Sequence, residues 1–214
     1  MSGRLSPDVR QQVEEGIRAL LQGGIVAYPT DTVYGLGASM SIPRAVEKVF
    51  AAKQRPRDIA LPLLVASTVQ IAALAGEVPP AARRLIDAFL PGALTLVLPA
   101  SPAVPDIVTA GGSTVAVRIP GHPIPIALIE GIGAPLVGTS ANVSGRPSPL
   151  TAAEVRSQLG GKIDLIIDDG RRCAGTESTI VDLSGKTPVI VRQGAVSAEA
   201  LRQVCPEILT SRGD

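Results

Sequence analysis

Apolar residues recur along the chain in two spacings, one typical of helices and one of buried strands. From Pro7 to Leu21 they return every three or four positions until Gly23 and Gly24, and Ser6 followed by Pro7 is a typical helix start. A helix over 43–52 is expected to be capped by Ser41, and one that begins at 68 by Ser67. The full set of predicted helices covers residues 7–22, 43–52, 68–76, 79–90, 124–130, 152–159 and 197 onward.

Short apolar runs bounded by Gly and Pro predict buried strands. They cover residues 25–28, 61–66, 94–98, 115–119, 135–138, 163–167, 179–183 and 189–192. The last two are joined by a hairpin-length turn at 184–188, so one strand pair is antiparallel. Strands and helices interleave without strict alternation, which predicts an α/β (α+β) fold with one twisted, mixed parallel and antiparallel sheet flanked by helices. Residues 207–214 are expected to be frayed.

Composition narrows the functional classes. The 214 residues are 45% apolar, enough for one buried core, but the aromatic residues are only Tyr28, Tyr34, Phe50 and Phe89. This excludes a platform of stacked aromatics for single-stranded nucleic acid. The net charge of +1 argues against a globally basic nucleic-acid binder.

The cysteines, the histidine and the hydropathy indicate a compartment. Cys173 and Cys205 form neither a disulfide framework nor a zinc pattern, and His122 is the single histidine, so no protein-built metal site is expected. No apolar run approaches the roughly 18 residues of a membrane span, and the first residues carry no signal-peptide pattern. The sequence therefore predicts a cytoplasmic protein without a membrane partner.

The segment YPTDTVYGLG at 28–37 places hydroxyls, a carboxylate and glycines directly after a strand, where a strand end meets a cleft. A capped turn with tyrosine packing is the alternative interpretation. KQRPRD at 53–58 brings three cations after a helix, and alternate positions of an extended chain point to one side, which suits a nucleotide triphosphate. A solvated helix end is the alternative there.

Arginines and small polar residues gather at other strand ends. Arg118 lies in an apolar strand and Arg192 at the end of another, so each needs an acidic protein partner or an anionic ligand. GTSANVSG at 138–145 offers small residues and backbone amides that anions can approach, and Ser178 opens a third hydroxyl-rich entrance. These segments are rich in donors and poor in candidate bases, which indicates an anion- or nucleotide-binding enzyme that works by positioning and charge stabilisation.

Seven segments in this order resemble the YrdC/TsaC family of threonylcarbamoyl-AMP synthases. The resemblance runs from Val9 to Gln193 and rests on PTDTVYGLG at 29–37, KQRPRD at 53–58, PGALTLVL at 91–98, TVAVRIPGHP at 114–123, GTSANVSG at 138–145, STIVDL at 178–183 and VRQG at 191–194. It implies a single catalytic domain over 9–194, followed by a C-terminal helix and tail over 195–214. It also implies an open basic cavity that turns L-threonine, bicarbonate and ATP into threonylcarbamoyl-AMP and pyrophosphate. The product would pass to a separate complex that modifies tRNA.

The resemblance assigns roles to residues of this chain. Those expected at L-threonine are Thr32, Arg118, Gly138 and Ser178. Those expected at ATP are Arg55, Ile59, Thr114, Ser140, Ser148 and Arg192. Lys53 and Arg55, with a Mg²⁺ ion, are expected to offset charge on the leaving pyrophosphate.

The chain also departs from the family pattern. Leu64 stands where two-domain relatives carry a histidine near threonine, and the PGALT motif at 91–95 lacks a second proline. Without the further domain of the longer relatives, closure of the site is expected from elsewhere, with loop 99–113 as the candidate. Two alternatives remain open: an RNA-binding or ribosome-associated module on the same fold that performs no chemistry, and a paralogue that acts on another carbamoyl or acyl substrate. A weak contact with tRNA or other RNA is among the expected partners of the synthase itself.

Overall fold

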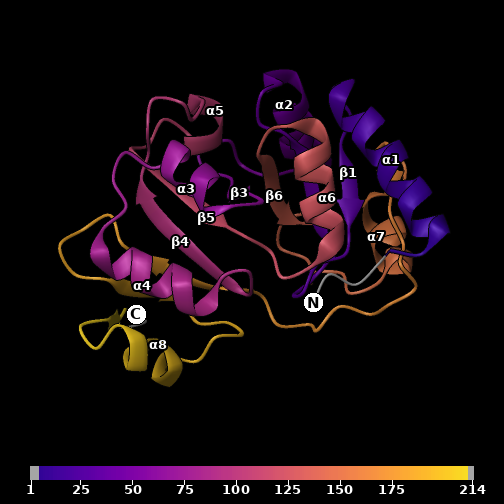
Figure 1. Cartoon of the computed structure of the whole chain (residues 1–214). Helices are drawn as coiled ribbons and strands as arrows, with labels where there is room; N and C mark the ends of the chain where they lie inside the picture. Colours follow the sequence, from indigo (N-terminus) through magenta and orange to yellow (C-terminus); the bar gives the residue numbers. More distant parts are fainter. Residues whose placement is uncertain (1–4, 212–214) are drawn as a thin grey trace.

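The computed structural model describes residues 5–211, which form one ten-stranded sheet with eight helices packed around it (Figure 1). The helices are α1 (Pro7–Leu21), α2 (Pro43–Lys53), α3 (Thr68–Leu74), α4 (Pro80–Phe89), α5 (Asp106–Thr109), α6 (Pro123–Ile132), α7 (Ala152–Leu159) and α8 (Ala198–Val204). The strands are β1 (Val26–Tyr28), β2 (Gly35–Ser39), β3 (Leu63–Leu64), β4 (Leu94–Pro99), β5 (Thr114–Arg118), β6 (Leu136–Ser140), β7 (Leu165–Ile166), β8 (Thr179–Asp182), β9 (Val189–Arg192) and β10 (Leu209–Thr210).

The sheet mixes strand directions, as predicted. Its order is β10-β9-β8-β4-β5-β3-β6-β2-β1-β7. Four pairs are parallel, β1 with β7, β3 with β5, β4 with β8 and β9 with β10, and the other pairs are antiparallel. The predicted hairpin between β8 and β9 is present.

Side-chain caps begin several of the predicted helices. The Ser6 hydroxyl accepts a hydrogen bond from the Val9 amide at α1, and Ser67 does the same for Gln70 at α3. The expected cap at Ser41 is wrong. The N-cap of α2 is Ile42, which has no capping side chain, and Pro43 begins the helix because its missing N–H needs no partner there.

Two segments expected to be irregular are strands. Residues 35–39, interpreted as part of a loop, form β2 between β1 and β6. Residues 209–210, expected to be frayed, form β10, which pairs with β9, while α8 packs against α4 near the C-terminus (Figure 1). The last three residues, 212–214, lie outside the described part of the chain. Within the predicted loop 99–113 a single helical turn, α5, is present.

The sheet separates two apolar cores, because successive strand residues point to opposite faces. Leu63 of β3 belongs to the larger core, which α2, α3 and α4 cover. Leu64 belongs to the smaller core beneath α1 and α6, which lie side by side (Figure 1).

The smaller core covers only part of its face of the sheet. Register places Arg118 of β5 beside Leu64, Ala116 beside Val97 of β4, and Ile180 of β8 beside Arg192 of β9. These residues line a cavity on the part of the face that continues past Leu64. The part of this sheet face that the smaller core leaves uncovered is therefore the candidate site. In residues 5–211 no helix has the length and apolar content to cross a bilayer.

Candidate active site

A cavity of about 300 Å³ lies over strands β2, β3, β4, β5, β6 and β8. Small residues such as Gly35 and Ala116 are among those that line it. Seven of the eleven residues expected at the site line it, and they are Thr32, Arg55, Arg118, Gly138, Ser140, Ser178 and Arg192. The other four, Lys53, Ile59, Thr114 and Ser148, are not among its lining residues.

Arg118 is buried at the cavity wall, with 8% of its side chain exposed. Its Nη2 donates to Asp31 Oδ1 at 2.6 Å, its Nη1 to Thr32 Oγ1 at 3.0 Å, and its Nε to the Gly92 carbonyl at 2.9 Å. The acidic partner that a buried arginine requires is therefore Asp31. A guanidinium has five N–H donors, so one on each Nη remains for a ligand. Two such donors match a carboxylate.

Hydroxyl groups continue the polar lining from both sides of Arg118. Thr30 and Thr32 share a hydrogen bond at 2.9 Å between their hydroxyls, and Thr95 and Ser178 share one at 2.8 Å. All four hydroxyl residues are buried and line the cavity. Together they present polar groups beside the arginine without a charge of their own.

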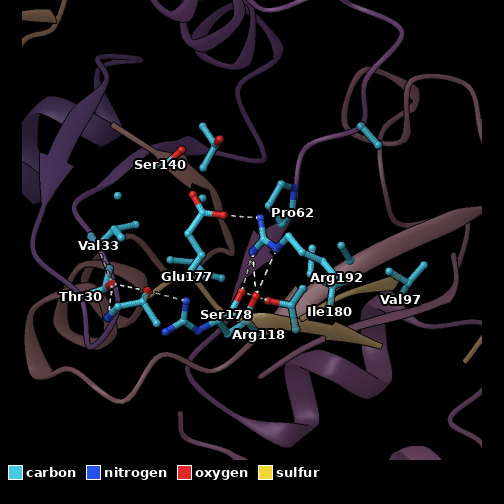
Figure 2. Close-up of a pocket in the computed structure, with 18 of the residues that line it drawn as sticks. Thr30, Val33, Pro62, Val97, Arg118, Ser140, Glu177, Ser178, Ile180 and Arg192 are labelled. Carbon is cyan, nitrogen blue, oxygen red and sulfur yellow. Dashed lines mark hydrogen bonds and ion pairs between the residues drawn. The ribbon is translucent and has the colours of Figure 1, made fainter. Parts of the chain in front are cut away.

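Arg192 reaches the cavity from β9. Its Nη2 donates to the Ser178 carbonyl at 2.8 Å and to the Ser178 hydroxyl at 3.2 Å. Its Nη1 donates to Glu177 Oε2 at 2.5 Å, and Figure 2 shows the two side chains meeting inside the cavity. The other oxygen of Glu177 accepts a hydrogen bond from the Ser148 hydroxyl at 2.7 Å.

Arg55 lies on the segment that follows α2. Its Nε donates to the Ile59 carbonyl at 3.2 Å and its Nη2 to the Ala60 carbonyl at 2.8 Å, so it holds the chain at 59–60 against the cavity. Burial lowers the pKa of the Arg55 guanidinium, which stays far above neutrality for this residue type. Ile59 itself is 45% exposed and lies beside the lining residue Ala60.

Lys53 lies elsewhere than the alternating pattern predicted. It is the last residue of α2 and is 2% exposed, and Gln54 follows in the left-handed conformation, so 53, 55 and 57 share no extended face. The Lys53 ammonium donates to the carbonyls of Ser140 and Asn142, the second at 2.8 Å. Burial and the neighbouring Arg55 lower the pKa of Lys53 to about 8. Lys53 thus supports the end of β6 from behind the cavity wall.

Gly138 and Leu64 are in contact across β6 and β3. A Cβ atom on Gly138 would lie 2.4 Å from Leu64 Cγ, so only glycine fits beside this leucine. Both residues line the cavity. The apolar side chain of Leu64 is thus in direct contact with a residue expected at threonine.

His122 caps α6 close to the Arg118 cluster. Its Nδ1 accepts a hydrogen bond from the Ile124 amide at 3.3 Å, and its Nε2 lies 3.5 Å from Asp169. Burial lowers the pKa of His122, against the opposing effect of Asp169 and Asp31. His122 is not among the lining residues of the cavity.

The sequence did not single out four polar residues that line the cavity, Thr30, Thr95, Thr139 and Glu177, nor Asp31, the partner of Arg118. Asp31 and Thr95 stand inside motifs that were recognised, and Glu177 directly precedes Ser178, but no spacing rule singled them out. No residue of 99–113 lines the cavity, so that loop is not its wall. Residues 5–211 hold no group of three His, Cys, Asp or Glu side chains placed to bind a metal ion.

The chain is similar in sequence to a known protein family and to several of its members. Residues 18–194 match the Sua5/YciO/YrdC family model, which carries the description telomere recombination. The chain is 45% identical over 206 residues to the threonylcarbamoyl-AMP synthase of Pyrococcus abyssi, covering 94% of this chain and 61% of that protein. It is 41% identical over 203 residues to the threonylcarbamoyl-AMP synthase of Bacillus subtilis, covering 94% of this chain and 59% of that protein.

A solved structure gives the same relationship. The crystal structure of Pyrococcus abyssi Sua5 complexed with L-threonine superposes with a TM-score of 0.92 at 42% identity. The match covers 97% of this chain and 60% of that one. The chain therefore spans about three fifths of the length of these relatives.

Proposed function

The chain belongs to the Sua5/YciO/YrdC family, and we propose that it is an L-threonylcarbamoyladenylate synthase, a nucleotidyltransferase. The reaction joins L-threonine, bicarbonate and ATP into threonylcarbamoyl-AMP, pyrophosphate and water. The observation that carries the proposal is the convergence of Arg55, Arg118 and Arg192 on one cavity of a nearly neutral protein. Relatives named for this activity, including one structure with L-threonine bound, support it.

The threonine end of the site is proposed at Arg118. Its two remaining N–H donors would hold the substrate carboxylate, with the Thr32 hydroxyl alongside. Gly138 and Ser178 would flank the amino acid, and the apolar Leu64 would contact its methyl group. Asp31 would keep the guanidinium in position without touching the substrate.

The nucleotide end is proposed at Arg55, Ser140 and Arg192 in the lining, with Ile59, Thr114 and Ser148 at the margin. The threonine amine attacks bicarbonate carbon, forming an N–C bond and releasing water, to give a carbamate. A carbamate oxygen then attacks the α-phosphorus in line, and the bond to pyrophosphate breaks. Arg55 would offset the charge of the leaving pyrophosphate, while Lys53 would act by holding β6 rather than at the phosphates.

We expect Mg²⁺ to enter with ATP. Glu177 is the one carboxylate among the cavity-lining residues of the described chain, and no group of metal-ligating side chains exists within 5–211. The donor set therefore fits an ion carried by the phosphate oxygens and water, with at most one protein carboxylate. When bound, Mg²⁺ would neutralise phosphate charge, and no step above depends on it.

The product is a reactive mixed anhydride, so an enzyme that transfers the threonylcarbamoyl group must consume it promptly. We propose that a tRNA-modifying transferase complex does so in the cytoplasm. A weak direct contact with tRNA belongs to the same proposal. The neutral charge and scarce aromatic residues do not favour tight RNA binding.

The test is an assay of pyrophosphate release with ATP, L-threonine and bicarbonate, each omitted in turn. We expect release only when all three are present, and threonylcarbamoyl-AMP in the mixture by mass spectrometry. Release that is unchanged without threonine would falsify the assignment. Serine in place of threonine separates this function from that of a paralogue with another substrate.

A further inference from the structure

Glu177 takes part in no bond-making or bond-breaking step of the reaction described above, yet its carboxylate occupies the site. One oxygen accepts a hydrogen bond from the Ser148 hydroxyl at 2.7 Å, and the other accepts one from Arg192 Nη1 at 2.5 Å. Both donors are residues expected to bind ATP. A carboxylate therefore stands where two nucleotide-binding groups converge, as Figure 2 shows for the Arg192 side.

Arg192 does not depend on Glu177 for its position. Its Nε and Nη2 both donate to the Ser178 carbonyl, at 3.3 and 2.8 Å, and Nη2 also donates to the Ser178 hydroxyl. The Nη1 group, which donates one of its two N–H bonds to Glu177, makes none of these contacts. Removal of the carboxylate would thus leave the guanidinium in place with one free edge.

Glu177 can leave by side-chain rotation alone. Its backbone carbonyl accepts a hydrogen bond from the Ala195 amide at 2.9 Å, which fixes the main chain. The side chain is 39% exposed, and the surrounding segment 167–178 has no helix or strand to constrain it. The main chain at Glu177 is therefore fixed, while its side chain is partly exposed to solvent.

Carboxylate and phosphate oxygens compete for the same donors, since arginine and hydroxyl groups bind both. The single proton of the Ser148 hydroxyl goes to Glu177, and one N–H of Arg192 Nη1 remains. A phosphate that bound both groups beside the Glu177 carboxylate would therefore lose the hydroxyl donor and meet strong repulsion at contact distance. We propose that Glu177 occupies the anion subsite formed by Ser148 and Arg192 in the nucleotide-free protein and is displaced by a nucleotide phosphate. Glu177 then lowers ATP affinity and speeds the exchange of anionic ligands. This inference rests on the proposed function, because it takes ATP as the ligand.

The test compares wild type with Glu177→Gln, whose amide keeps the size and one acceptor oxygen but not the charge. Glu177→Ala is the second variant. The matched control is Glu207→Gln, since Glu207 pairs with Arg84 away from the cavity at similar side-chain exposure, 46% and 43% against 39% and 43%. ATP and pyrophosphate binding are measured by calorimetry in EDTA and again in Mg²⁺, with thermal unfolding as a check on the fold.

We expect both Glu177 variants to bind ATP and pyrophosphate about twofold to fivefold more tightly than wild type in EDTA, the factor that an ion pair of this exposure contributes. Glu207→Gln should leave binding unchanged. Weaker or unchanged binding in the folded Glu177 variants overturns the proposal, because Glu177 would then orient Arg192 or do nothing. Unchanged ATP binding in EDTA together with weaker ATP binding in Mg²⁺ overturns it and indicates that Glu177 is a metal ligand.

The failure of the proposed function has a different signature. Wild type that binds ATP but releases no pyrophosphate with threonine and bicarbonate would contradict the synthase, whatever Glu177 does to affinity. Wild type that binds neither ATP nor pyrophosphate would overturn the Glu177 proposal as well.

Discussion

Arg118 donates to Asp31 at 2.6 Å through Nη2, so the arginine expected to bind a substrate carboxylate already has a carboxylate partner in the protein. The pair is buried, with 8% and 20% of the two side chains exposed. Asp31 stabilises the charge of Arg118 and leaves two of its five donors for a ligand. The ion pair and the binding role are therefore compatible, and they predict different effects for different substitutions.

Arg118→Lys should weaken threonine binding far more than ATP binding. Lysine keeps a positive charge for Asp31 but cannot present two parallel donors to a carboxylate. Loss of a charge-assisted contact of about 1.5–3 kcal/mol predicts a threonine Kd raised about tenfold to hundredfold. Calorimetric titration with each substrate measures this, and Arg84→Lys, in an ion pair away from the cavity, is the control. An equal loss of both affinities would contradict the carboxylate role.

Lys53→Met should destabilise the fold. The substitution leaves the buried carbonyls of Ser140 and Asn142 without their ammonium donor, at about 1–3 kcal/mol for each unpaired group. We expect the free energy of unfolding in urea to fall by about 2 kcal/mol or more. Lys48→Met is the matched control, because Lys48 is on the same helix and donates to one carbonyl, that of Gly23, from the surface. A stability equal to that of the control would show that Lys53 does not support β6.

Gly138→Ala should disturb the cavity from within. The new methyl group would meet Leu64 Cγ at 2.4 Å, and overpacking of this kind costs about 1–3 kcal/mol. We expect lower stability in urea and weaker threonine binding, since both residues line the cavity. Gly161→Ala is the control, as a Cβ there meets nothing within 4 Å. Unchanged threonine affinity in a destabilised Gly138→Ala protein would place the amino acid elsewhere.

Most helices and strands could be predicted because their signals are local. Ser6 and Ser67 accept hydrogen bonds from the amides that their capping positions require, and the apolar run at 94–98 is a strand largely buried on both faces. β2 could not be predicted, because Gly35 and Gly37 resemble a loop. These two positions require glycine because of tertiary packing. A Cβ atom on Gly35 would lie 2.8 Å from Tyr28 Cε2, and one on Gly37 would lie 2.8 Å from Tyr28 Oη, so the glycines make room for a side chain of the neighbouring strand β1.

Within the candidate site, too, residues with a local sequence signal could be predicted, and residues placed by tertiary contacts could not. Arg118 and Arg192 could be found, because an arginine in an apolar strand is unusual in any sequence. The direction of Lys53 could not, since a left-handed Gln54 turns the chain after α2 and no pattern specifies that turn. Glu177 was missed for a related reason: its partners, Ser148 and Arg192, are brought to it by the fold.

His122 should make the protein less stable below neutral pH. Burial lowers its pKa beneath the usual 6.5, so between the folded and unfolded pKa values the unfolded chain binds more protons. The contribution of His122 to the free energy of unfolding is therefore complete above the usual pKa of 6.5, and it falls as the pH drops from that value toward the folded pKa. His122→Asn should flatten this part of the pH profile, because asparagine keeps a capping acceptor for the Ile124 amide without titrating. Urea unfolding at several pH values for both proteins gives the difference.

His122 is the one histidine of the chain, so its proton NMR titration reports the folded pKa directly. A value above 6.5 would mean that attraction by Asp169 outweighs burial and would reverse the predicted slope.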